Sequence, residues 1–292
     1  MLRLDQAFPA TIAFRLLAPI AIAIAASAGG CATWQSEPAA EATKLAADQL
    51  TPPLGHVALE TMFLRLEGDD LATLQTVWPQ LDEISFDLAL RRELEMNGIR
   101  CGVVLGSMPT EIQRLLQRTQ QLIKDDPMEN ADLNSDVSSH PQTIVCKSGI
   151  SKDITVKPQR PGGLTILHRD GSAKGKTYQS PAMMLKLAGV VRPAGGVRLS
   201  VRPFIEHGEY RSQVTGQAFA MRREVARETQ HWPNLEVTRE LMPNQILVLG
   251  STLPPKALGS HFFSAEEAGG RRVATLLLIR VGASNADTAF IR

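Results

Sequence analysis

The sequence has few aromatic residues and no excess of one charge. Phe, Trp and Tyr make up 5% of its 292 residues, and its formal net charge is +1. Residues 1–30 contain Arg3, Arg15 and Asp5, so the rest of the chain is formally neutral. A neutral chain has no long-range field that attracts nucleic acid, and scarce aromatic rings offer little for bases to stack on. We therefore expect no nucleic acid partner.

Short motifs of metal sites and hydrolases are also missing. The sequence has no C-x-x-C, H-E-x-x-H or G-x-S-x-G, which argues against a zinc knuckle, a thioredoxin-type site and an α/β-hydrolase nucleophile. Asp132, Asn134 and Asp136 begin like a calcium loop, but Val137 replaces the required Gly and Thr143 the required Glu. We expect no metal, no cofactor and no catalytic residue.

A nucleotide-binding loop is excluded by spacing. The segment from Arg169 to Ser180 contains Gly-Lys-Thr, but only three residues separate Gly171 from Gly175, where a phosphate-binding loop has four. Pro181 also prevents the helix that must follow such a loop. Asp170-Gly171 between two alternating segments is typical of a hairpin, so we predict a β-turn there and no nucleotide.

The N-terminus has the parts of an export signal. Basic residues precede an apolar run from Leu16 to Ala26, too short for the roughly 20 residues that span a bilayer. The next stretch, Ala28-Gly29-Gly30-Cys31, resembles the lipobox of bacterial lipoproteins, with Ala28 where that family prefers Leu. The resemblance implies a signal peptide over residues 1–30 and a diacylglyceryl group on the Cys31 thiol. The chain would then be held to the lipid bilayer by its acyl chains.

The resemblance also implies a location. Ala32 provides no Asp retention signal, which favours the outer membrane, facing the periplasm. Two alternatives remain open. Cleavage after Ala26-Ser27-Ala28 would give a soluble secreted protein that begins at Gly29, and an uncleaved leader would act as an anchor helix.

The other two cysteines have two interpretations. Cys101 and Cys146 both stand in strand-like sequences, and an exported chain meets an oxidising compartment. Neighbouring strands would allow a disulfide between them. Otherwise the two are separate buried thiols that pack as small apolar residues.

Hydrophobic patterning predicts an α+β fold in two units. Residues 31–54 are a flexible tether, rich in Ala, Glu, Thr and Pro. Residues 55–124 are expected to form a small β-α-α-β-α unit, with strands at Val57–Leu66 and Ile99–Leu105. Its helices are expected from Asp69 to Val77, from Asp87 to Met96 and from Pro109 onward.

A polar stretch, residues 125–140, is expected to be a linker or an exposed loop before a β-rich, sandwich-like unit at 141–292. Short alternating segments there predict nine strands. They are Gln142–Lys147, Asp153–Lys157, Leu164–His168, Lys176–Ala188, Val197–Ile205, Val214–Arg222, Asn234–Leu241, Gln245–Leu249 and Val273–Val281. Leu258–Phe263 is expected to be a tight apolar loop.

One polar cluster could carry chemistry. Glu206, His207 and Glu209 follow a predicted strand, and His207 and Glu209 would share a face if the strand continued. They would then offer an acid/base pair or two metal ligands. Gly208 favours a turn, in which case the cluster is a polar strand end.

The C-terminal part resembles another envelope family. A P-x-Q-x-L-V-L-G segment ends at Gly250, L-G-x-x-F-F ends at Phe263, and an apolar strand covers Thr275–Ile279. This order is similar to the last part of secretin pore subunits, although Ser251 replaces the second Gly of that family. The resemblance implies a ring-forming component of a secretion or pilus assembly.

These observations favour an envelope lipoprotein with a non-catalytic binding or structural role, which contacts other envelope proteins. Such an interaction module would expose an apolar patch or a free sheet edge, for which Ile246–Leu249 is the candidate. The alternatives are a secretin-like component and an exported enzyme with a site near Glu206, His207 and Glu209.

Overall fold

The computed structural model describes residues 55–68, 70–125, 141–193, 195–217, 220–266 and 270–282. Its first part has the predicted β-α-α-β-α order. The elements are β1 (His56–Glu67), α2 (Asp70–Val77), the 3₁₀ helix η1 (Trp78–Gln80), α3 (Leu88–Met96), β2 (Ile99–Val104) and α4 (Thr110–Asp125). Asp87 caps α3 as its position suggested, because its carboxylate accepts hydrogen bonds from the amides of Ala89 and Leu90.

The second part is rich in strands, which confirms the predicted α+β class. Its first elements are β3 (Gln142–Lys147), β4 (Ser151–Lys157), β5 (Gly163–Asp170), β6 (Ser172–Gln179), β7 (Ala182–Val191), β8 (Val197–Gln217) and β9 (Ala220–His231). The 3₁₀ helix η3 (Pro233–Leu235), β10 (Val237–Leu241), β11 (Ile246–Ser251), α5 (Ala257–Phe263), β12 (Ser264–Glu266) and β13 (Arg272–Val281) follow.

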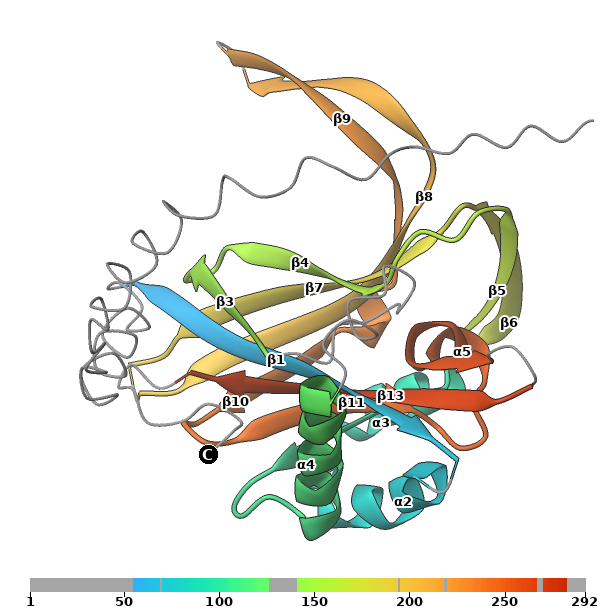
Figure 1. Ribbon diagram of the computed structural model, residues 1–292. Helices are drawn as coiled ribbons and strands as arrows, with labels where there is room; N and C mark the ends of the chain where they lie inside the picture. The colour runs from blue at the N-terminus through green and yellow to red at the C-terminus, as the bar shows by residue number, and fades with distance from the viewer. Residues whose placement is uncertain are drawn as a thin grey trace, which may run out of the picture. The chain divides into compact units, whose positions relative to one another are not determined.

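The strands form two main antiparallel sheets (Figure 1). The central sheet has the order β2-β11-β13-β1-β3, with β12 also paired to β13. The second sheet has the order β10-β8-β7-β4, with β9 also paired to β8, and the β5–β6 hairpin forms a separate two-stranded sheet.

Strands β2, β11, β13 and β1 of the central sheet are largely buried on both faces, whereas the edge strand β3 is mostly exposed. One core lies between this sheet and the second sheet, where Leu59 and Ile279 join Leu185 and Val201. The other core lies between the central sheet and the helices α2 and α4, with Leu64, Leu276 and Leu278 beneath Leu74 and Leu115. Adjacent residues of a strand point to opposite faces, so burial on both sides accounts for the unbroken apolar run of β13.

The two predicted units meet in this central sheet. Strands β1 and β2 come from the 55–124 unit, and β13 and β11 from the 141–292 unit are their antiparallel partners. The described residues, from 55 to 282, accordingly belong to one compact body. Because β11 lies between β2 and β13 and all six of its residues are buried, Ile246–Leu249 is not the free edge that we expected.

Several predicted elements have different bounds. The predicted strand Lys176–Ala188 is two strands, β6 and β7, separated at Ser180 and Pro181, where Ser180 has a φ of 46°. The predicted strand Val214–Arg222 covers the end of β8 and the start of β9, which pair with each other. Leu258–Phe263 is part of helix α5 instead of a loop. The predicted turn at Asp170-Gly171 does connect β5 and β6, with Gly171 at a φ of 70°.

Candidate functional site

The cluster predicted from Glu206, His207 and Glu209 lies within β8. The strand does not end at Ile205 but continues to Gln217, and Gly208 lies in an irregular segment where the pairing with β9 shifts register. Gly208 has a φ of 73°, a conformation that costs glycine little. The expected turn is therefore a bulge that changes the direction of β8 without ending it.

His207 packs at this bulge against an aromatic ring and a carboxylate. Its ring lies 4.9 Å from that of Tyr178, and its Nδ1 is 3.9 Å from Glu228 Oε2. Burial lowers the pKa of His207; Glu228 raises it, while Lys176 and Arg227 lower it further. Among the described residues, no group of three or more His, Cys, Asp and Glu side chains could hold a metal ion. The arrangement fits packing better than ligation.

Arg227 of β9 fastens the same bulge from the other strand, and sequence reasoning missed it. The residue is only 6% exposed, its Nε donates to the Gly208 carbonyl at 3.0 Å, and its guanidinium also donates to the Ser180 carbonyl. The guanidinium lies 5.8 Å from the Tyr210 ring centroid. An Arg in a charged strand looks solvated in sequence, so no local signal could have shown this role.

Beyond the bulge, β8 and β9 form a two-stranded ribbon, residues 207–217 and 220–228. The last pair between β7 and β8 is Ala182 with Glu206, so within the described structure the outer part of β8 pairs with β9 alone (Figure 1). One face of the ribbon exposes Tyr210 and Val225, at 68% and 65%. The opposite face carries an ion pair, Arg211 Nη1 to Glu228 Oε1 at 2.7 Å.

A second feature is a cavity of about 710 Å³ beside α5. Its polar lining comprises Lys157, Arg160, Ser260, His261, Ser264 and Arg272, with Glu266 at the edge strand β12. Leu71, Leu164, Met183 and Val273 supply apolar surface. These residues come from α2, β5, β7, α5, β12, β13 and the end of β4, so the cavity exists only in the folded chain.

The charges in the cavity lie close together. Lys157 is 5% exposed, and its ammonium donates to the Ser264 carbonyl. Burial lowers the pKa of His261, and the nearby positive charges of Lys157 and Arg160 lower it further. His261 is therefore a neutral imidazole near pH 7, which can donate one hydrogen bond and accept another.

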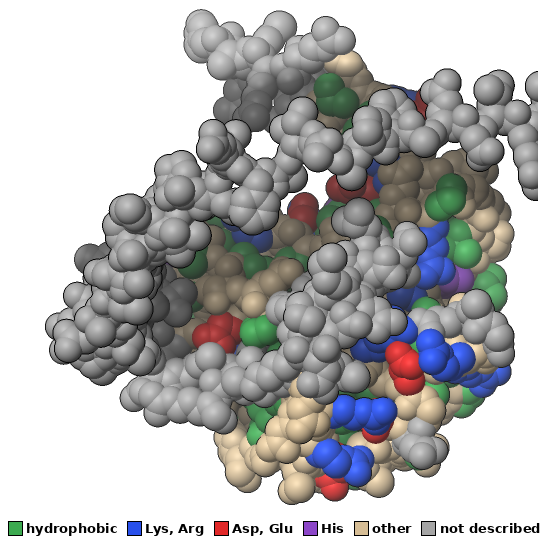
Figure 2. Space-filling view, in the orientation of Figure 1, with side chains coloured by type: hydrophobic (Ala, Val, Ile, Leu, Met, Phe, Trp, Pro, Cys, Tyr) green, Lys and Arg blue, Asp and Glu red, His purple; other side chains and the backbone are tan. Residues whose placement is uncertain are grey.

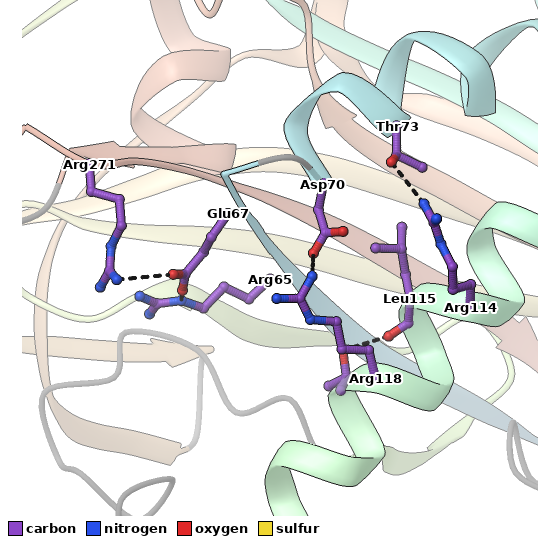
Figure 3. Close-up of polar contacts among 9 residues, drawn as sticks. Arg65, Glu67, Asp70, Thr73, Arg114, Leu115, Arg118 and Arg271 are labelled. Carbon is purple, nitrogen blue, oxygen red and sulfur yellow. Dashed lines mark hydrogen bonds and ion pairs between the residues drawn. The ribbon is translucent and has the colours of Figure 1, made fainter.

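Arginines on the neighbouring surface are matched by acidic partners. Figure 2 shows Lys and Arg side chains interspersed with Asp and Glu over α2, α4 and the start of β13. The ion pairs and hydrogen bonds are drawn in Figure 3: Arg65 with Glu67 at 2.5 Å, Arg271 with Glu67 at 3.5 Å, Arg118 with Asp70 at 2.5 Å, and Arg114 with Thr73 at 3.0 Å. Arg271 thus points to Glu67, whereas the next residue, Arg272, lines the cavity.

Cys101 and Cys146 are two free, buried thiols, so the disulfide interpretation is wrong for this structure. They lie on β2 and β3, the opposite edges of the central sheet, with three strands between them. Neighbouring strands are about 4.8 Å apart, which places the two residues far beyond bonding distance. Burial raises the pKa of both thiols, to about 12 for Cys101.

The predicted lipidation site, Cys31, lies outside the described residues, as do the signal peptide and the tether. In the part of the chain that the structure describes, no helix is both long and apolar enough to cross a membrane. No family model matches the chain, and neither the curated proteins nor the solved structures yielded a match.

Proposed function

We propose that this protein is a membrane-anchored envelope lipoprotein, held by acylated Cys31, whose role is to bind another envelope protein through the β8–β9 ribbon. The anchor is supported by the sequence of residues 1–31. The binding role is supported by the ribbon, and one observation carries it: a two-stranded ribbon that exposes Tyr210 and Val225 on a single face.

Two physical arguments connect the ribbon with binding. A two-stranded hairpin is marginally stable in water by itself, so a long one gains from a partner that covers it. Exposed tyrosine is also common in protein interfaces, because its ring buries much apolar area while its hydroxyl stays hydrogen-bonded. The Arg211–Glu228 pair on the opposite face would keep that face in water.

The contacts around His207 and Gly208 support a binding role over an enzyme site. His207 packs on Tyr178, and Arg227 holds the bulge through the Gly208 carbonyl. These contacts fix the direction in which the ribbon leaves the second sheet. A fixed direction lowers the entropy that the ribbon loses when it binds.

The anchor is tested by the intact mass of the protein extracted from the membrane fraction. We expect a chain that begins at Cys31 and carries the mass of its acyl groups, and we expect Cys31→Ser to abolish that mass. Recovery of chains that begin at Gly29 without added mass would overturn the anchor and leave a secreted protein.

The ribbon is tested by a photo-crosslinking amino acid placed at Tyr210 in intact cells, with Arg211 on the opposite face as the matched position. We expect a discrete adduct with a second protein from position 210 and none from position 211. A ladder of multimers of this chain would instead favour the secretin-like alternative. The absence of any adduct from position 210 would contradict the proposed role.

A further inference from the structure

The cavity beside α5 has the size of a ligand site. Its volume of about 710 Å³ lies within the range of roughly 300–1,000 Å³ that small-molecule pockets occupy. Its walls come from strands of both main sheets, from α2, β5 and α5, and from the loops around Arg160 and Pro254. The backbone amide of Arg160 donates to the Pro181 carbonyl at 3.1 Å. None of the described ribbon residues lines it, so the cavity is treated as a separate feature from the proposed binding arm.

Positive charge predominates in its lining. Among the described lining residues, Lys157, Arg160 and Arg272 are cationic, Glu266 is acidic and lies opposite Arg272 in the β12–β13 pair, and His261 is neutral. A concave surface with low-dielectric walls concentrates such a field. Guanidinium groups also bind phosphate and carboxylate oxygens with paired hydrogen bonds. The polar side of the cavity is thus suited to an anionic group.

Other lining residues of the cavity are apolar. Met183 and Val273 belong to the buried core, and Leu71 and Leu164 pack against it from α2 and β5. A small inorganic anion would leave this surface in contact with water. A ligand with both an anionic head and an apolar body would cover it.

We propose that this cavity binds a small anionic amphiphile. Its phosphate or carboxylate head would lie among Lys157, Arg160 and Arg272, and its apolar body against Leu164, Met183 and Val273. The His261 imidazole would donate a hydrogen bond to the head.

The experiment is isothermal titration calorimetry on the purified full chain with three probes: n-hexyl phosphate, inorganic phosphate and n-hexanol. We expect hexyl phosphate to bind at one site, inorganic phosphate to bind at least tenfold more weakly, and hexanol to give no measurable binding. The inorganic phosphate arm separates an amphiphile from free phosphate as the source of the anion.

Adjacent arginines provide matched variants. Arg272→Gln removes a guanidinium from the cavity, whereas Arg271→Gln removes the same charge from the Glu67 side. Both residues are exposed, so both variants should fold. We expect Arg272→Gln to weaken hexyl phosphate binding about tenfold, as the loss of one charge-assisted hydrogen-bonding group does, and Arg271→Gln to change it less than twofold.

Several results would overturn the proposal. If hexanol bound as tightly as hexyl phosphate, the cations of the cavity would contribute nothing to affinity. If inorganic phosphate bound as tightly as hexyl phosphate, the apolar lining would contribute nothing. Equal losses in the Arg271 and Arg272 variants would show attraction to the surface charge as a whole. Failure of hexyl phosphate to bind the full chain would also contradict it.

Discussion

At the scale of single residues, the most consequential side chains are charged or polar groups held away from water. His261 is an example, because burial and two neighbouring cations keep its imidazole neutral. Glu60 is another: burial raises its pKa even though Arg280, its partner across β1 and β13, lowers it. Such groups couple the stability of the fold to pH.

His261 gives a prediction about acid stability. Its pKa in the folded protein is below the ordinary value of 6.5, so the unfolded chain takes up the proton first as the pH falls. The contribution of neutral His261 to the free energy of unfolding is fully present above pH 6.5. It is lost as the pH falls from there through the lowered pKa of the folded protein. Between about pH 7.5 and pH 5.5, we expect the wild type to lose more free energy of unfolding than His261→Gln. Denaturant titrations give the free energy of unfolding at each pH. If it fell equally with pH in the wild type and in His261→Gln, the prediction would be contradicted.

The roles of single residues were the hardest part to predict from sequence. The turn at Asp170-Gly171 was predicted because turn chemistry is local and Gly171 needs a positive φ. Arg227 could not be predicted because its partners, the Gly208 and Ser180 carbonyls, lie far away in the sequence. Arg272 could not be predicted because the cavity that it lines is assembled from distant segments. Of the cluster Glu206, His207 and Glu209, His207 lies where the pairing of β8 with β9 shifts register, whereas Glu206 is in regular pairing.

At the scale of elements, helix α5 depends on one close backbone contact. The amide of Gly259 donates to the Asn97 carbonyl at 2.8 Å, and a Cβ on Gly259 would lie 1.8 Å from the Gly98 carbonyl oxygen. Asn97 in turn exchanges hydrogen bonds with the backbone of Arg169 in β5. The turn after α3 therefore positions α5, which carries His261 into the cavity.

We expect Gly259→Ala to lower the free energy of unfolding by about 3 kcal/mol, because α5 must move to admit the methyl group. Gly106→Ala is the matched control, since its Cβ would meet no atom within 4 Å. The control should change stability by less than about 0.5 kcal/mol in chemical denaturation. Similar losses of unfolding free energy in the two variants would show that the close approach of Gly259 to Gly98 does not explain the destabilisation.

The elements that sequence patterns located well are those with local signals. Strand β3 and helix α3 have caps, turns and regular apolar spacing, and their predicted and observed bounds nearly agree. The predicted strand over 214–222 was wrong because the β8–β9 hairpin reverses within a stretch that has no Pro or Asn-Gly to mark a turn. Helix α5 was missed because a seven-residue apolar segment does not show a helical period.

At the scale of the whole molecule, the organising feature is a central sheet built from both ends of the described chain. Strand β1 has β13 on one side and β3 on the other, so residues from 56 to 281 meet in one layer. The sequence indicated the α+β class and, over residues 55–124, the order of elements. It could not indicate this pairing, because strand partners distant in sequence leave no local pattern.

This sheet predicts that neither part folds alone. A fragment of residues 141–292 lacks β1 and β2, which pair with β13 and β11. We expect it to show no cooperative thermal transition by circular dichroism. The control is the full chain cut at a protease site inserted between residues 126 and 140. That nicked chain should keep its transition, and a fragment that melts cooperatively would disprove the argument.

The number of reactive thiols tests both the acylation of Cys31 and the burial of Cys101 and Cys146. Cys101 and Cys146 are buried with raised pKa values, so neither should react with a maleimide at pH 8 in the native protein. In guanidinium chloride we expect two of the three cysteines to react, because the Cys31 sulfur would be a thioether. Mass spectrometry reads the number, and three labelled thiols would mean that Cys31 is not acylated.

The pairing of Leu59 with Val281 has a consequence for the order of events in the cell. A polypeptide leaves the ribosome or a translocase from its N-terminus, so β1 emerges long before β13, the strand that completes its layer. During that interval the apolar residues of β1 have no final neighbour. We expect the nascent protein to need a chaperone that holds its early segments until synthesis is nearly finished.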